Sequence, residues 1–121
     1  AFWDFMPTLA DITNSSKELN TDGISYLPTL LSTEEQKEHE YLYWEFHELG
    51  GRKALRSGDW KLIKQPINGE TVTELHNLKE DIHEDNDLVN EYPEKVKELE
   101  QLMDGARTHS DMFNFGIQVQ Q

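Results

Sequence analysis

A run of short segments with alternating apolar and polar residues constrains the fold of this 121-residue chain more than any other feature. Three such segments follow one another between Tyr41 and Ile63, and a fourth spans Thr71–His76. An alternation of period 2 is typical of β-strands with one buried face. Glycine-containing turns separate the segments, at positions where a chain reversal needs a positive φ: Gly50-Gly51, Ser57-Gly58-Asp59 and Asn68-Gly69. The pattern predicts a four-stranded antiparallel meander.

A helix is predicted after the last strand, from Pro93 to Met103. Pro93 suits a first helical turn, and Asn90 is a candidate cap. The apolar stripe that this helix presents comprises Val96, Leu99 and Met103. We expect it to pack on the face of the first strand that carries Leu42, Trp44 and Phe46. The opposite face, with Tyr41, Tyr43, Glu45 and His47, is mixed and suits an interface or a substrate rim. The predicted fold class is therefore α+β.

The first 40 residues have a different pattern. Asp4 is a plausible cap for a short amphipathic helix with Phe5, Leu9 and Ile12 on one side. Residues 27–31 form a short helical or irregular segment, and residues 33–40 a charged linker. Aromatic residues return near the end, at 113 and 115, and are expected to dock on another surface.

Composition excludes several classes of partner. With 24 acidic and 11 basic residues the formal net charge is −13, which disfavours nucleic acid and anionic membranes. The absence of cysteine excludes disulfides, thiolate catalysis and thiolate zinc sites. No apolar run approaches the ~20 residues of a membrane span. A hydrophobic content of 36% is low for an independent domain, as it would be in a piece that packs on a missing partner.

His47 and Arg52 are the candidate substrate-binding residues. They flank the Gly50-Gly51 turn, where a cation and a neutral donor could contact a sulfate group or a sugar hydroxyl. An equally weighted alternative is a local polar cluster in which both residues pair with Glu45 and Glu48.

No catalytic or metal-binding residue is predicted. The acidic segment 81–87 invites a calcium-loop interpretation, but Asn86 and Tyr92 occupy the positions where an EF-hand needs glycine and glutamate. No histidine pair has zinc-ligand spacing, and no serine lies in a nucleophile elbow.

Several motifs, in order along nearly the whole chain, resemble the C-terminal subdomain of the type I sulfatases, the arylsulfatase family of the alkaline-phosphatase-like superfamily. The motifs are Asp4-Phe-Met-Pro7-Thr8-Leu9, Asp22-Gly23-Ile-Ser25-Tyr-Leu-Pro28-Thr-Leu30, Tyr43-Trp44-Glu45-Phe46, Arg56-Ser-Gly58-Asp59-Trp60-Lys61-Leu62, Glu74-Leu75-His76-Asn77-Leu78 and Asp85-Asn86-Asp87-Leu88. Each motif is weak alone, and the ordered set is specific. Ile82-His83-Glu84 departs from the Pro-Gly-Glu that is frequent in the family.

The resemblance implies that residues 1–40 are the tail of a catalytic domain with a linker, and that residues 41–121 are the C-terminal subdomain. It implies a fragment of a sulfuric ester hydrolase acting on sulfated glycans, in which this segment supplies structure and the rim of the substrate pocket. The formylglycine nucleophile and the calcium ion would belong to the missing catalytic domain, the segment's partner, so the segment alone should be inactive. Family members are commonly periplasmic or otherwise exported. The alternative is a non-catalytic carbohydrate-binding or protein-interaction module.

Overall fold

The computed structural model describes residues 1–16, 18–33, 35–48 and 50–110. The chain divides into two compact units, Ala1–Glu40 and Tyr41–Gln121, which we describe one at a time as unit 1 and unit 2. The predicted docking of the aromatic residues at 113 and 115 lies outside the described residues.

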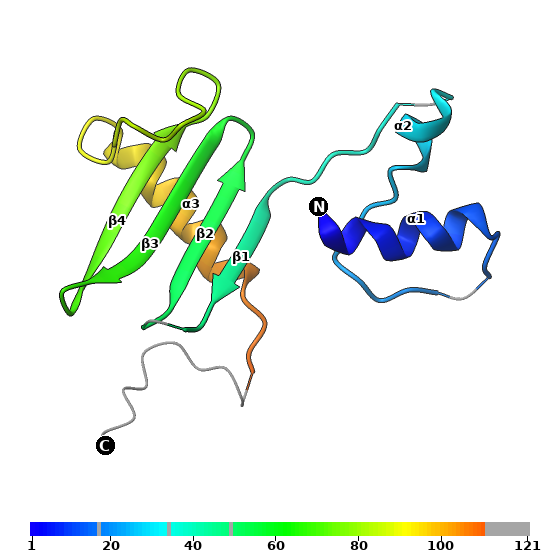
Figure 1. Cartoon of the computed structure of the whole chain (residues 1–121), viewed down its shortest axis with the longest axis horizontal. Helices are drawn as coiled ribbons and strands as arrows, with labels where there is room; N and C mark the ends of the chain where they lie inside the picture. Colours follow the sequence, from blue (N-terminus) through cyan, green and yellow to red (C-terminus); the bar gives the residue numbers. More distant parts are fainter. Residues whose placement is uncertain (17, 34, 49, 111–121) are drawn as a thin grey trace. The chain divides into compact units, whose positions relative to one another are not determined.

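Unit 1 contains three short helical segments: the 3-10 turn η1 (Phe2–Asp4), helix α1 (Phe5–Ile12) and helix α2 (Leu27–Leu31) (Figure 1). Asp4 occupies the N-cap position of α1, as predicted, but its side chain makes no capping hydrogen bond. Pro28 lies in the first turn of α2, where its missing N–H removes no intrahelical bond.

Unit 2 is built on a four-stranded antiparallel sheet with strand order β1-β2-β3-β4 (Figure 1). The strands span Leu42–Phe46, Arg52–Ser57, Trp60–Ile67 and Glu70–Asn77. The short turns hold glycines at positive φ, as at Gly58 (57°) and Gly69 (85°). The predicted meander and the α+β fold class are confirmed.

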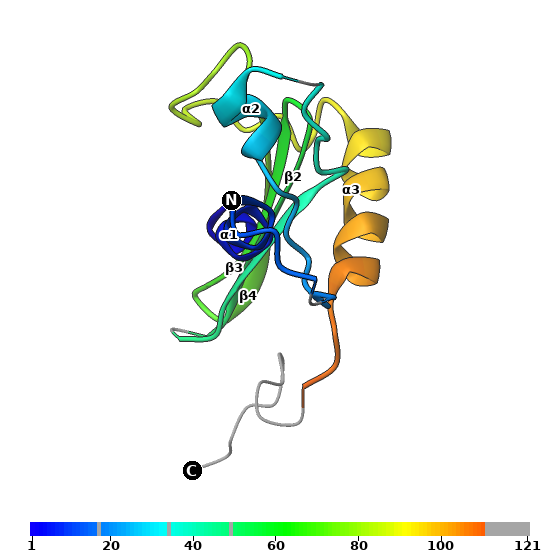
Figure 2. The same ribbon diagram turned by 90° about the vertical axis from the view of Figure 1, so that its right-hand side faces the viewer.

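Helix α3 (Pro93–Ala106) covers one face of this sheet (Figure 2). Its N-cap is Tyr92 rather than Asn90, because the Tyr92 carbonyl accepts the first helical bond, from Val96. Five buried hydrophobic residues form the core between the helix and the sheet: Leu55, Leu62, Leu75, Leu99 and Met103.

The prediction that the helix packs on the β1 face with Leu42, Trp44 and Phe46 is wrong. Tyr43 lies opposite Leu55 and packs on the buried core, whereas Trp44 and Phe46 are 40% and 51% exposed. The register decides this, because Leu55, Leu62 and Leu75 are cross-strand neighbours and Tyr43 continues their row. We call the face with Tyr43 the helix-covered face and the face with Trp44 the open face.

Candidate functional site

His47 belongs to a polar cluster on the helix-covered side of β1. Its Nε2 lies 3.0 Å from Oε2 of Glu45, and Nε of Arg107 donates to Oε1 of Glu45 at 2.8 Å. The hydroxyl of Tyr43 donates to the same Oε1 at 2.5 Å. Burial and the Glu45 carboxylate both raise the pKa of the Tyr43 hydroxyl above its ordinary value, so this phenol stays a proton donor. The cluster ties the end of α3 to the first strand.

Arg52 lies on the open face instead. It is the cross-strand partner of Phe46 at the start of β2, and its side chain is exposed. A shallow groove of about 470 Å³ runs over this face, lined by Trp44, Phe46, Arg52 and Ile63 among others. An apolar floor with a guanidinium at its border suits a sugar ring or an apolar partner surface.

The two predicted substrate-binding residues therefore point to opposite faces of the sheet and do not form one site. The local-cluster alternative describes His47, which pairs with Glu45. Substrate contact by either residue remains a prediction.

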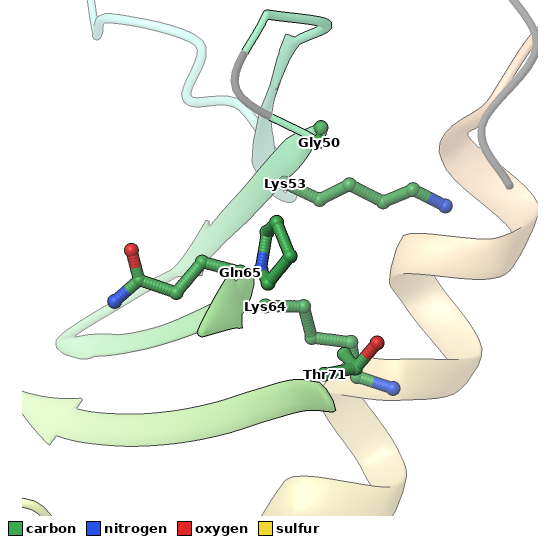
Figure 3. A pocket seen from close by; sticks show the side chains of 7 residues that line it. Gly50, Lys53, Lys64, Gln65 and Thr71 are labelled. Atoms are coloured by element: carbon green, nitrogen blue, oxygen red, sulfur yellow. The ribbon is translucent and has the colours of Figure 1, made fainter. Parts of the chain in front are cut away.

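A second recess, of about 250 Å³, opens where the β1–β2 and β3–β4 hairpins meet (Figure 3). Lys53 and Lys64 line it together with Thr71, the Gly50-Gly51 turn and Pro66. Gly50 has a φ of 88°, and an added Cβ would lie 2.8 Å from Cγ of Pro66, so only glycine fits this wall. Pro66 is tolerated within β3 because β2 pairs with that strand only as far as Lys64. Sequence reasoning missed this recess.

The acidic loop is held against β4 by hydrogen bonds. Oδ1 of Asp87 accepts the N–H groups of Leu75 and Val89, each at 3.0 Å. Nδ1 of the buried His76 lies 2.9 Å from the carbonyl oxygen of Asn86. Within the described part of the chain, no group of three or more His, Asp or Glu side chains could hold a metal ion. Asp81 and Asp87 therefore act as acceptors of backbone N–H groups, and Glu84 pairs with Lys61, roles that the number of acidic residues in the sequence does not reveal.

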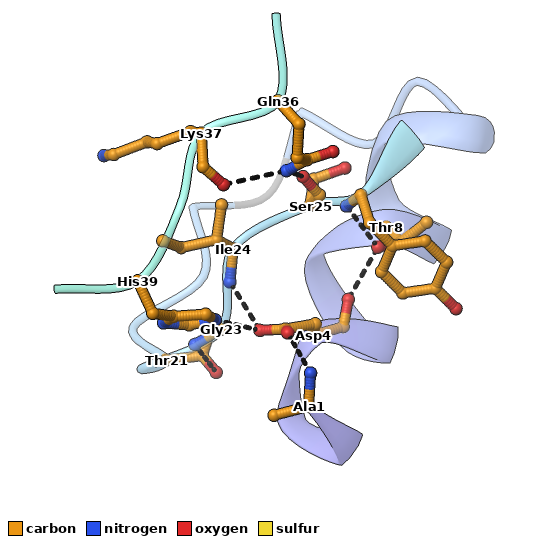
Figure 4. A network of polar contacts seen from close by, with 11 residues as sticks. Ala1, Asp4, Thr8, Thr21, Gly23, Ile24, Ser25, Gln36, Lys37 and His39 are labelled. Atoms are coloured by element: carbon orange, nitrogen blue, oxygen red, sulfur yellow. Dashed lines mark hydrogen bonds and ion pairs between the residues drawn. The ribbon is translucent and has the colours of Figure 1, made fainter. Parts of the chain in front are cut away.

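Unit 1 is organised around the buried carboxylate of Asp4 (Figure 4). Its Oδ1 accepts the Ile24 N–H at 2.9 Å and lies 2.8 Å from Nε2 of His39, while Oδ2 contacts the amino group of Ala1. Burial by itself would raise the pKa of Asp4, but these hydrogen bonds outweigh it and hold the pKa below its ordinary value. Asp4 thus joins three separate stretches of unit 1.

Thr8 continues this network one turn along α1. Its hydroxyl donates to the Asp4 carbonyl at 2.6 Å and accepts the Tyr26 N–H at 3.1 Å. Among the described residues, unit 1 buries only Asp4 and Thr8 fully, and every fully buried hydrophobic side chain is in unit 2. Polar contacts therefore hold the middle of unit 1.

No helix in the described ranges is both long enough and apolar enough to cross a membrane.

Comparison with known proteins identifies the class. No family model matches the chain, and no curated protein matches it. Solved structures do. A candidate sulfatase from Bacteroides thetaiotaomicron is 28% identical with a TM-score of 0.74, covering 84% of this chain and 23% of its own. The 2-O GAG sulfatase BT1596 is 26% identical with a TM-score of 0.72 (85% and 23% covered). BT4656, solved with its substrate D-glucosamine-2-N,6-O-disulfate, is 26% identical with a TM-score of 0.70 (85% and 23% covered).

The chain folds as a small α+β unit that is similar to part of the sulfatases. The chain is similar to sulfatases over most of its length but spans about a quarter of theirs, which agrees with a C-terminal sulfatase subdomain. The resemblance predicted from the ordered motifs is confirmed.

Proposed function

We propose that this chain is the C-terminal part of a larger sulfatase that hydrolyses sulfate esters of glycans, to which it supplies structure and the rim of the substrate pocket. The observation that supports this proposal is the structural similarity to larger sulfatases. The match covers 23% of each of those sulfatase chains. The described residues offer no metal-ligand cluster, and the sequence lacks both the cysteine and the Ser-x-Pro-x-Arg motif expected to carry the nucleophile. The chemistry, with calcium and formylglycine, is assigned to a catalytic domain.

The exposed apolar surface of unit 1 supports the proposal that a catalytic domain packs on it. Apolar side chains of η1, α1 and α2 are 50% to 87% exposed: Phe2, Phe5, Met6, Leu9, Ile12, Leu30 and Leu31. We call this set the apolar surface of unit 1. Monomeric proteins rarely leave so many large apolar side chains together in water. A covering domain would bury them, and the polar Asp4 network would then fix the shape that is presented to it.

The proposed substrate is a sulfated sugar. BT4656 was solved with a doubly sulfated glucosamine as its substrate, and BT1596 is described as acting on GAG. In this chain Arg52 is the better placed of the two predicted rim residues, because it is exposed beside the aromatic groove while His47 is engaged with Glu45. Export to the periplasm is part of the same proposal.

Arg52→Ala in the full-length parent enzyme tests the rim role. A contact made equally to the ground and transition states contributes to KM rather than to kcat. We therefore expect KM for a sulfated oligosaccharide to rise roughly threefold to tenfold, while turnover of a minimal aryl sulfate is unchanged. The isolated 121-residue chain should hydrolyse neither substrate.

Two outcomes would contradict the proposal. Turnover of an aryl sulfate by the pure isolated chain would place the chemistry in this segment. A parent gene that encodes neither a Cys-x-Pro-x-Arg nor a Ser-x-Pro-x-Arg motif upstream would instead favour a carbohydrate-binding or protein-interaction module, which the exposed Trp44 and Phe46 could serve.

A further inference from the structure

Positive charge is concentrated on two strands of an otherwise acidic chain. Residues 52–65 contain five of the 11 basic residues and a single acidic residue, Asp59. The register of β2 and β3 places two of the five, Lys53 and Lys64, directly opposite each other. Like charges in that position destabilise a sheet. Glu45 of β1 faces Lys53 from its other side, but that carboxylate already accepts from Tyr43 and Arg107 and pairs with His47.

The two lysines share the recess at the hairpin ends (Figure 3). Both side chains extend toward α3, with the Thr71 side chain beside that of Lys64. Gln65 points the other way, and its amide donates to Glu74 at 3.2 Å. The recess thus offers two ammonium groups and one hydroxyl, and none of the residues that line it is acidic.

A carboxylate of α3 contacts Lys64 from outside the lining. Oε1 of Glu100 in α3 lies 2.6 Å from Nζ of Lys64, at the surface, where both side chains are about one-third exposed. Exposed ion pairs of this kind contribute little to stability, because water screens them. A ligand anion can therefore share or replace Glu100 at little cost.

The walls set the size of the ligand. The turn glycines add no side chain to the opening, and Pro66 forms an apolar side. A volume of about 250 Å³ is below the usual range for drug-sized ligands, so it admits one charged group and part of the ring that carries it. A long polyanion would meet the repulsion of the whole acidic chain, whereas one charged sugar is affected far less.

We infer that the recess between Lys53 and Lys64 is a binding subsite for one anionic group of an acidic sugar, a sulfate ester or a uronic acid carboxylate. Its lysine side chains lie on the helix-covered side of the sheet, and its lining shares Lys53 and Gln65 with that of the Arg52 groove. The choice of a sugar rests on the proposed function. The anion site itself rests on the lysine pair and the recess alone.

NMR titration of the isotopically labelled 121-residue chain tests the site directly. The probes are D-glucosamine-2-N,6-O-disulfate, D-glucuronic acid, neutral N-acetyl-D-glucosamine and inorganic sulfate. We expect the disulfate or the uronic acid to shift the amide signals of Lys53, Lys64 and Thr71, and the neutral sugar to leave them unchanged. The acid that binds more tightly identifies the anionic group. Inorganic sulfate should bind more weakly, since it makes no contact through a ring.

Matched variants assign the binding to the lysines. Lys53→Gln and Lys64→Gln should each weaken binding roughly threefold to tenfold, as expected for loss of one charged contact. Lys97→Gln makes the same charge change on an exposed site outside the recess and should have no effect. Glu100→Gln removes the competing carboxylate and should tighten binding. A thermal melt of each variant confirms folding, and losing one lysine of the pair should not lower stability.

Several results would overturn the inference: shifts that map elsewhere, equal shifts with the neutral sugar, a Lys53→Gln/Lys64→Gln double variant that binds normally, or sulfate that binds as tightly as both acidic sugars. The inference and the proposed function fail separately. An active parent sulfatase whose C-terminal segment shows no binding at the recess overturns only the subsite. An inactive parent whose segment still binds the acidic sugar overturns only the assignment as a sulfatase.

Discussion

At the scale of single residues, backbone proximity explains one of the motifs by which the sequence resembles the sulfatases. In the segment that begins Asp22-Gly23, a Cβ added to Gly23 would lie 2.3 Å from the carbonyl oxygen of Trp3. No side chain fits there, because the obstacle is backbone rather than a movable side chain. Glycine at this position lets the segment approach η1 closely enough for Asp4 to accept the Ile24 N–H.

Gly23→Ala should therefore disrupt unit 1. Forcing a methyl group into such a contact costs at least about 1–3 kcal/mol, which is large for a small polar network. An NMR spectrum would report this disruption, because the Ile24 amide signal would leave its folded position. Gly105→Ala makes the same chemical change inside α3, where nothing lies within 4 Å, and should stabilise unit 2 by about 0.5–1 kcal/mol. Two variants with effects of the same sign would contradict this account.

The lowered pKa of Asp4 predicts that unit 1 is sensitive to acid. A carboxyl whose pKa is lower in the folded state than its ordinary value of 3.8 stabilises the fold at higher pH. This stabilisation is lost as the pH falls below about 3.8, through the folded-state pKa. Hydrogen bonds led by the Asn86 backbone N–H also lower the pKa of Asp81, so the acid transition must be followed with a probe in unit 1.

The measurement is the pH dependence of the Ile24 amide shift in the wild type and in Asp4→Asn. The variant should lose the dependence in this window and be less stable at neutral pH. A variant that keeps the wild-type acid transition would show that another group controls it.

At the scale of elements, the single buried layer of unit 2 depends on α3. Leu99 and Met103 are 1% and 2% exposed against three leucines of the sheet that are fully buried. Among residues 41–48 and 50–110, which the structure describes in this unit, no second helix covers the open face (Figure 2). The stability of unit 2 therefore rests on one helix–sheet interface.

Leu99→Ala should lower the free energy of unfolding by about 2–5 kcal/mol, the range for truncating a buried leucine. Ile82→Ala, at a residue that is 69% exposed, removes a similar side chain from water and should change it by less than about 0.5 kcal/mol. Circular-dichroism melts compare the two. Equal midpoints for both variants would place α3 outside the core.

At the scale of the whole molecule, the two units differ in how they are held together. Unit 2 has an apolar core, whereas unit 1 buries a carboxylate and a hydroxyl and leaves the apolar surface of unit 1 in water. The proposed catalytic domain would cover this apolar surface.

The substitution Leu9→Gln tests whether a catalytic domain covers the apolar surface of unit 1. Leu9 is 53% exposed, so in the isolated chain the substitution should change stability by less than about 0.5 kcal/mol. In the full-length enzyme, where the proposed partner buries this side chain, we expect a loss of about 2–4 kcal/mol, from the lost transfer energy and an unpaired amide. Thermal unfolding of both proteins makes the comparison. An equally small effect in the full-length enzyme would show that this part of α1 faces solvent there too.

The sequence alone determined the elements of this protein and their order. Period-2 alternation between glycine turns predicts each of the four strands, and the spacing of Val96, Leu99 and Met103 predicts the helix, because these signals are local. The resemblance to sulfatases rests likewise on short motifs in order.

Only the tertiary structure decided which face of β1 is buried and which residues meet. Tyr43 and Trp44 are both large and aromatic, so hydrophobicity does not distinguish the two faces of β1. The cross-strand register, which places Tyr43 opposite Leu55, distinguishes the two faces. The alternation of faces along the strands separates His47 from Arg52, and the register of the β2–β3 hairpin brings Lys53 opposite Lys64. Burial of Asp4 depends on contacts 20 and 35 residues away in sequence, and for that reason a helix cap was the best prediction that its neighbours allowed.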